Sequence, residues 1–240
     1  MKSTSKKNNV CFIRPKHERM CHLFWLFNEK TLFLQLKEQE FYFKTENKKK
    51  MEKRLANPAP LGLMGFAMTT ILLNIHNMGF FPISVSIIAM GIFYGGLAQI
   101  IAGIMEFKKG NTFGTTAFLS FGLFWLSLVA IWIMPDMGYN LAGASDANTM
   151  GWYLFLWGVF AFFMWMGTWG GRKVSQFIFF TATALFFLLA IHNWTASNAS
   201  LSNFFAVAAG CTGVICGSAA FYLAMAEVLH ESRGKVILPY

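Results

Sequence analysis

Residues 56–77 read ANPAPLGLMGFAMTTILLNIHN and open the most apolar part of a chain of 240 residues. With Asn57 as the N-cap, Pro58 and Pro60 fall at the first and third positions of a helix. Backbone N–H groups at these positions have no partner within the helix, so proline is tolerated there. The stretch therefore predicts the start of a helix, and the apolar block from 61 to 78 is near the length needed to cross a bilayer.

The same apolar character continues to the end of the chain. The sequence is 55% hydrophobic, with 27 Phe and 8 Trp, and its positive mean hydropathy is not that of an ordinary soluble domain. Short polar connections separate blocks near the roughly 20 residues that a membrane-spanning helix needs. We therefore expect an all-α polytopic membrane protein with six transmembrane helices, near 61–78, 84–105, 113–134, 150–169, 174–192 and 203–229.

The net charge of +9 is concentrated near the N-terminus. Residues 1–50 hold twelve of the 20 Lys and Arg and five of the 11 Asp and Glu. Residues 51–240 therefore hold eight basic and six acidic residues, a net charge of +2. A basic tail beside an apolar body indicates a cytoplasmic flank and no nucleic-acid partner. Alternate loops of the body, 79–83, 135–149 and 193–202, contain no Lys or Arg. Because basic loops stay cytoplasmic, this alternation predicts six spans with both termini in the cytoplasm.

Residues 1–50 form an extension that differs in character from the membrane domain of residues 51–240. Stretches rich in Lys, Asn and Glu, such as 45–50, are typical of disorder, and an ordered amphipathic flank is the alternative. The apolar run 23–27 is too short for the core of a signal peptide. Met51 offers a second start, so one hypothesis is that residues 1–50 come from a wrongly assigned start codon.

Ionisable residues are scarce within the six blocks. Glu106 and Glu227 fall near the cytoplasmic ends of the second and sixth blocks, and His76 and His192 near the outer ends of the first and fifth. Since buried charge in a membrane usually serves function, this scarcity argues against a pump built on a central carboxylate relay. The polar residues that remain are neutral, which suits a small, weakly held solute. Candidates for its path are Thr70, Asn74, Asn77, Tyr94 and Gln99.

Small residues recur at helical spacing in two of the blocks. Gly91 and Gly95 lie four apart in the second block, and the sixth contains a stripe made of Gly210, Gly213, Gly217, Ala220 and Ala224. Helices in lipid pack closely through such residues. One interpretation is a tight bundle only. The other is that small residues leave room for a narrow pore, which aromatic side chains from facing helices close.

The sequence offers no catalytic or metal centre. The four cysteines form no CxxC pair and have no nearby His at metal-ligand spacing, so we expect free thiols. A haem held by His76 and His192 is the rival hypothesis, since a histidine pair in a helical bundle can ligate haem iron. Both histidines lie at span ends and precede an Asn, which favours helix-terminal hydrogen bonding and no cofactor.

Several stretches carry a resemblance to a known family. The segment NPAPLGL at 57–63 resembles the signature of the acetate uptake transporter family, and the body from Met51 to Pro239 is similar to bacterial succinate–acetate permeases of that family. The resemblance does not extend to residues 1–50, which supports the start-codon hypothesis. Further matching stretches are MTTILLN at 68–74, AMGIFYGGLAQ at 89–99, KGNTFG at 109–114, and YLAM at 222–225 with Glu227.

The resemblance implies a homo-oligomer, a hexamer, in which each protomer carries its own path for acetate and succinate. It also implies an aromatic and aliphatic constriction midway along that path, and by position the constriction residues are Phe66, Phe121 and Ala182. The signature itself would mark an entrance formed by Asn57, Pro58, Ala59, Pro60, Leu61 and Gly62. Two prolines leave few free N–H groups to hold an anion. We therefore expect a rigid, charge-poor entrance that fixes Phe66 one to two turns further along.

Two constriction positions depart from the family pattern. Phe121 stands where Tyr is usual and lacks a hydroxyl that could donate to a carboxylate, and Ala182 stands where Leu is common. We hypothesise a wider, less polar pore that tolerates slightly larger monocarboxylates such as lactate. Compensating bulk from Phe180 or Trp165 is the alternative.

The mechanism stays open between two modes at this point. Acetate at neutral pH is almost wholly ionised, because reference carboxyl pKa values lie near ~4. Crossing as the acid requires a proton, and the candidates for carrying it are Glu106, Glu227 or a histidine. The resemblance favours proton-linked uptake through the bacterial inner membrane. The alternatives are channel-like flow of acetate or other small monocarboxylate anions, and a sensor or scaffold without flux.

Overall fold

The computed structural model describes residues 33–47, 55–139 and 146–239, and the chain divides into two units, Met1–Ala56 and Asn57–Tyr240. In the first unit, residues 33–47 form a helix whose residues are all exposed. Lys44 lies 2.6 Å from Glu40 one turn earlier, which lowers the pKa of that carboxyl and supports the helix. The disorder predicted for residues 1–50 as a whole stays a prediction. The rest of that range, and Met51, lie outside the described residues.

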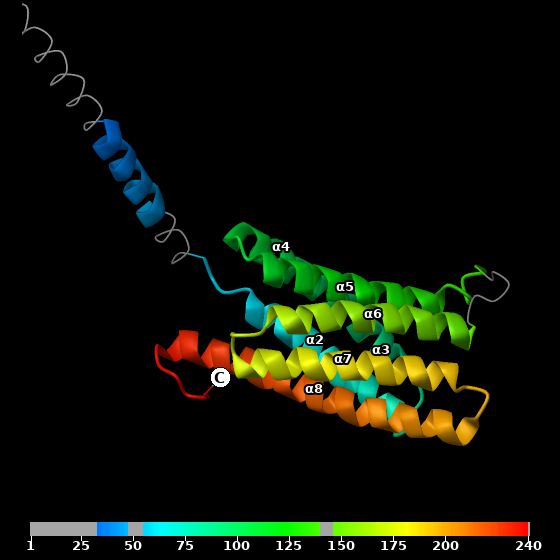
Figure 1. The fold of residues 1–240 in the computed structure, drawn as a ribbon. Coiled ribbons are helices and arrows are strands. Elements are labelled where there is room, and N and C mark those ends of the chain that lie inside the picture. The colour runs from blue at the N-terminus through cyan, green and yellow to red at the C-terminus, as the bar shows by residue number, and fades with distance from the viewer. Residues whose placement is uncertain (1–32, 48–54, 140–145, 240) are drawn as a thin grey trace, which may run out of the picture. The chain divides into compact units, whose positions relative to one another are not determined.

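The second unit contains six helices long and apolar enough to cross a membrane. The described residues contain no strand, so the all-α class and the six predicted spans are confirmed, with bounds that shift by a few residues. The sixth helix is the longest because it continues past the apolar block into charged residues. Along the chain the helices are α2 (Ala59–Asn77), the continuous run of α3 (Val85–Met90), η1 (Gly91–Ala98) and α4 (Gln99–Lys109), α5 (Thr112–Ile133), α6 (Ala147–Gly167), α7 (Lys173–Trp194) and α8 (Ala199–Arg233) (Figure 1).

Short polar residues set several helix boundaries. Asn111 precedes α5 and its side chain accepts a hydrogen bond from the backbone N–H of Gly114, and Asp146 and Asn198 cap α6 and α8 in the same way. Such caps satisfy N–H groups that a helix start leaves free. Gly110 ends α4 with φ of 74°, a left-handed conformation that favours glycine. These residues make the tight turn between α4 and α5.

The helices of the second unit lie side by side around a shared interior (Figure 1). Helix α2 packs against α8 on one side and against η1 and α4 on the other, while α7 lies between α6 and α8. Helix α4 pairs with α5, and aromatic rings of α5 and α6 meet each other, as Phe121 and Phe160 do. The result is a ring of helices whose interior holds the candidate path.

The small residues of α8 pack directly against α2. A Cβ at Gly217 would lie 2.9 Å from the carbonyl oxygen of Ala67, and one at Gly213 would collide with the side-chain amide of Asn74. Gly91 and Gly95 leave similar room for Val129 and Trp125 of α5. The tight-bundle interpretation is therefore confirmed for these glycines, because neighbouring helices fill the space beside them.

The charged residues of the bundle separate along its length. Every Lys and Arg in 55–139 and 146–239 lies at the end formed by the α4–α5 turn, the α6–α7 turn and the last turn of α8 with its tail. We call this the basic end. Asp136 and Asp146 lie at the opposite end, between α5 and α6. The charge alternation seen in the sequence thus corresponds to two distinct ends of one bundle.

Candidate functional site

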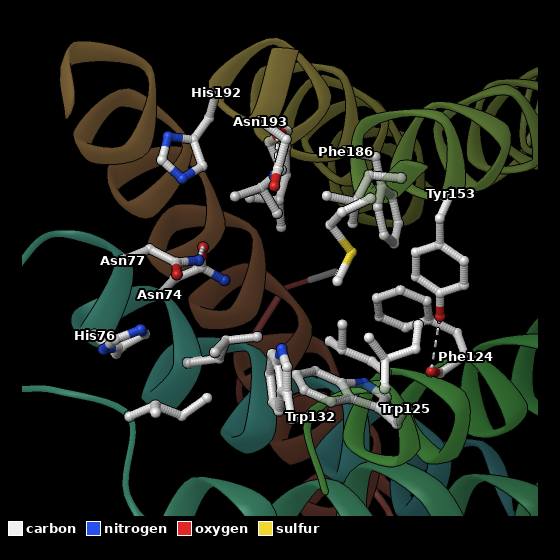
Figure 2. Close-up of a pocket in the computed structure, with 18 of the residues that line it drawn as sticks. Asn74, His76, Asn77, Phe124, Trp125, Trp132, Tyr153, Phe186, His192 and Asn193 are labelled. Carbon is white, nitrogen blue, oxygen red and sulfur yellow. Dashed lines mark hydrogen bonds between the residues drawn. The ribbon is translucent and has the colours of Figure 1, made fainter. Parts of the chain in front are cut away.

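A cavity of about 790 Å³ enters the bundle from the end opposite the basic end. It extends from Asp136 and Asp146, beside the α5–α6 connection, to Phe66 on α2 and Ala182 on α7 in the interior. Its walls come from α2, α5, α6 and α7, as Figure 2 shows. The cavity therefore runs partway through the ring of helices.

Neutral polar side chains line one wall of the cavity. The side-chain amide of Asn77 donates to Oδ1 of Asn74 at 3.1 Å, and that of Asn74 donates to the carbonyl oxygen of Thr70 at 2.8 Å. Asn193 lies across the cavity on α7 (Figure 2). These groups offer amide dipoles without a full charge, which suits a small solute that must leave again.

Two other predicted path residues lie outside this cavity. The side chain of Gln99 is buried and donates to the carbonyl oxygen of Gly95 at 2.7 Å, and a Cβ at Gly65 would lie 3.3 Å from its Cγ. Tyr94 is likewise absent from the cavity lining. Both belong to the run of η1 and α4, whose inner face packs on α2 and α5. Periodicity alone could not separate this packing face from the cavity wall.

The inner end of the cavity meets a cluster of aromatic rings. Phe121 on α5 lies 5.8 Å from Phe66 between ring centroids and stacks on Phe186 at 6.2 Å. Phe160 and Phe179 approach the same ring at 5.4 and 6.2 Å. Since Phe66, Phe121 and Phe186 are all buried, these rings fill the interior between the cavity and the basic end.

Ala182 lies beside Phe66 and is also buried. The structure thus brings Phe66, Phe121 and Ala182 together, although they come from three helices. Phe180 does not supply the bulk missing at 182, because it is 49% exposed and contacts Trp165 on the outside of the bundle. Phe186, one turn after Ala182, is the inward-facing ring, and sequence reasoning missed it because α7 is apolar on every side.

The two histidines lie at the mouth of the cavity. Nδ1 of His76 is 2.7 Å from the carbonyl oxygen of Phe81, and Nδ1 of His192 is 2.9 Å from that of Ser202. Each ring is thus tied to the backbone of the following loop or helix, as the expectation of helix-terminal hydrogen bonding requires.

The NPAPLGL segment begins α2 with its side chains in a charged setting, which corrects the expectation of a charge-poor entrance. The helix starts at Ala59, so Pro58 takes the cap position given above to Asn57. Oδ1 of Asn57 accepts from the N–H of Ala59 at 3.2 Å and from Nζ of Lys109 at 3.2 Å, while its Nδ2 donates to Glu227 at 2.9 Å. Charged residues of α4 and α8 therefore converge on the signature.

The two acidic residues predicted to carry protons belong to the same polar network. Glu106 is 1% exposed, accepts a hydrogen bond from Asn111 at 2.6 Å and lies 3.7 Å from Nζ of Lys109. Glu227 pairs with Arg172 of the α6–α7 turn. Through Lys109 and Asn57 the network joins both carboxylates at the basic end, and neither lines the cavity. Sequence spacing gave no sign of this link, since its members lie on four separate segments.

Comparisons with known proteins find relatives that are named as transporters or channels, and a solved structure with a similar fold. A sequence model of the GPR1/FUN34/yaaH family matches residues 41–240, and so begins within the N-terminal extension. The succinate-acetate/proton symporter SatP of Escherichia coli (strain K12) is 60% identical over 186 residues, which are 78% of this chain and 95% of that protein. Acetate permease A of Emericella nidulans is 35% identical over an alignment that spans 78% of this chain and 66% of that protein. A solved structure of the bacterial acetate channel SatP superimposes with a TM-score of 0.72 at 59% identity, covering 78% of this chain and 99% of that one.

Proposed function

Because this chain belongs to the GPR1/FUN34/yaaH family, we propose that it takes up acetate and succinate across the bacterial inner membrane. It is a membrane protein, with six helices able to span a bilayer, and the named relatives are known for transport and not for catalysis. The observation that carries the proposal is the cavity that narrows onto Phe66, Ala182 and the aromatic rings around Phe121. A small carboxylate fits such a polar vestibule above an apolar constriction.

The apolar constriction affects an ionised substrate and a protonated one differently. Phe66 and Phe121 offer no hydrogen-bond partner to an ionised carboxylate, so a bare anion loses hydration there without replacement. A carboxylic acid carries no net charge and loses less on entering the same zone. Proton-linked uptake follows from this difference, and Glu106 and Glu227 are the proton carriers that we propose.

Channel-like flow of acetate without proton coupling is the second candidate. It is favoured by the similarity to the solved SatP structure, because that protein is described as an acetate channel. In this mode the aromatic rings separate transiently, and amide dipoles such as those of Asn74 and Asn193 stand in for part of the water shell. Net charge then moves with each acetate, which the proton-linked mode avoids.

One experiment separates the two modes. The purified protein is reconstituted into liposomes that contain a pH-sensitive dye. The liposomes are equilibrated without a protonophore, and an inward acetate gradient is then applied. Proton symport acidifies the lumen more than passive entry of acetic acid acidifies liposomes without protein. Planar bilayers that contain the protein then show no acetate current. A current that reverses at the acetate equilibrium potential supports the channel. Liposomes without either signal would overturn transport altogether and leave a sensor or scaffold.

We further propose that the basic end faces the cytoplasm and that six protomers assemble together. Basic loops stay on the cytoplasmic side, so both termini lie inside and the cavity opens outward. Large apolar side chains such as Leu156, Phe163 and Phe204 are exposed on the bundle, and lipid or neighbouring protomers would cover them. Native mass spectrometry in detergent tests the assembly, where a monomer would contradict it. Labelling of single introduced cysteines from either side tests the orientation.

A further inference from the structure

Among the described residues, four buried side-chain atoms have no hydrogen-bond partner; Oε1 of Gln99 and Oε1 of Glu106 can only accept, and the other two belong to groups that can donate. They are the hydroxyl of Thr70 on α2 and the indole N–H of Trp125 on α5. Each side chain belongs to a residue that is 2% exposed, and both residues line the cavity. A buried donor without an acceptor is costly, so a native protein that keeps two of them near one cavity needs an explanation.

The hydroxyl of Thr70 differs from other threonine hydroxyls in the bundle. Thr181, Thr183 and Thr212 each donate to the carbonyl oxygen four residues earlier, at 2.7 to 2.8 Å. Thr70 makes no such bond, so its proton is available to another acceptor. The indole of Trp125 can act only as a donor. The two groups therefore share a chemical preference for an acceptor.

Packing holds both groups at the inner part of the cavity. The cavity ends at Phe66, and Thr70 lies one helical turn from Phe66 toward the mouth of the cavity. A Cβ at Gly95 would lie 2.8 Å from the Trp125 ring and 2.9 Å from the methyl group of Thr69, so the indole packs beside this part of α2. The histidines and aspartates of the cavity wall lie at its mouth. No protein carboxylate at the inner end of the lining competes for these donors.

We propose that Thr70 and Trp125 form an occluded binding site for the carboxylate group of the substrate, on the cavity side of Phe66. The inference rests on the proposed function and deepens it, because it names the groups that hold the acid. Both groups can donate to a carboxylate oxygen, and hydrogen bonds to an ionised acceptor are stronger than those to a neutral one. The site therefore holds the anion in preference to the protonated acid.

Both donor atoms are closed off from solvent in this structure. A carboxylate reaches them only when a neighbouring side chain moves, and Phe66 is the ring that borders the site one turn away. Binding of the substrate is thereby linked to displacement of the constriction.

Direct binding of radiolabelled acetate to the purified full-length protein in detergent at pH 7 tests the site. Thr70→Val keeps the volume and loses the hydroxyl, and Trp125→Phe keeps an aromatic ring and loses the N–H. Each change should weaken acetate binding about tenfold or more, because one bond to a charged group is lost. Thr70→Ser should restore the affinity, since it restores the donor.

Matched controls lie outside the cavity lining. Thr183→Val removes a hydroxyl that bonds within its own helix, and Trp152→Phe changes an exposed ring, so both should bind acetate as the unmodified protein does. If Trp125→Phe loses thermal stability, the Thr70 pair of variants still decides the matter. Unchanged affinity of Thr70→Val beside normal transport would overturn this site alone. Failure of the unmodified protein to bind or move acetate would overturn the proposed function instead.

Discussion

Asn57 at the start of α2 donates its side-chain amide to Glu227 on α8, with Nδ2 and Oε2 2.9 Å apart across 170 positions of sequence. The other atom of the amide, Oδ1, accepts from Nζ of Lys109. An amide can donate to a carboxylate on one side and accept from an ammonium on the other. Asn57 thereby links charged residues of α4 and α8 at the start of α2.

Asn57→Asp should destabilise the protein by about 1–3 kcal/mol, because a donor is lost and two carboxylates then face each other. Thermal unfolding in detergent measures this loss as a lower Tm. The double variant Asn57→Asp with Glu227→Gln restores a donor opposite an acceptor and should recover part of it. A double variant no more stable than Asn57→Asp would show that the amide pairing is not the cause.

Ala182→Leu should narrow the substrate range. The three added carbons enter the space beside Phe66 at the inner end of the cavity, where Phe180 contributes no bulk. We expect lactate to compete several-fold less well against labelled acetate uptake, while acetate uptake itself persists. Equal competition by lactate before and after the change would contradict the hypothesis that Ala182 widens the path.

Gly213→Ala should loosen the contact between α8 and α2, because its Cβ collides with the Asn74 amide. Overpacking of this kind costs about 1–3 kcal/mol, and displacement of Asn74 also disturbs the cavity wall. A lower Tm together with slower acetate uptake is expected. Ser218→Ala, on the exposed side of the same helix, is the control and should leave both measurements unchanged.

Glu106→Gln should separate proton coupling from acetate movement. Gln keeps an oxygen that accepts from Asn111 but removes the charge beside Lys109. Acetate exchange between the two sides of a liposome should continue, while acetate-driven proton movement falls. Glu231→Gln, at the same end but exposed, should keep both. Intact coupling in Glu106→Gln would leave Glu227 as the proton carrier.

Much of the fold could be predicted because the bilayer imposes a simple rule on composition. Six apolar blocks of spanning length and alternating basic loops are visible without any structure, and they correspond to six helices with their basic residues at one end. Helix starts were less clear, since the predicted blocks began at 150 and 203, whereas α6 and α8 start at Ala147 and Ala199, directly after the capping residues Asp146 and Asn198. The position of Pro58 differed by one residue, which is the usual uncertainty of a helix boundary.

The candidate site was harder to predict because apolar helices show no preferred face. Phe180 and Phe186 lie on the same helix with similar surroundings in sequence, yet one faces outward and the other stacks on Phe121. Likewise, Gln99 and Asn74 are both buried amides, but only Asn74 lines the cavity. Such differences depend on which helices become neighbours. The resemblance supplied Phe66, Phe121 and Ala182, and nothing in the periodicity would have singled them out.

The π-helical segment Gly91–Ala98 in the middle of the second span has a consequence for how the chain tolerates length changes. A π-helical turn accommodates an extra residue, so the helix before it and the helix after it can keep their faces. Loss of one residue inside this segment can convert it to ordinary α-helix while Gly103, which packs on Leu119 of α5, keeps its face. Loss of one residue from Gln99 to Met105 has no such buffer and rotates Glu106 by about 100°. We expect single-residue deletions to be tolerated on one side of Gln99 and not on the other, as a scan scored by membrane expression and acetate uptake would reveal.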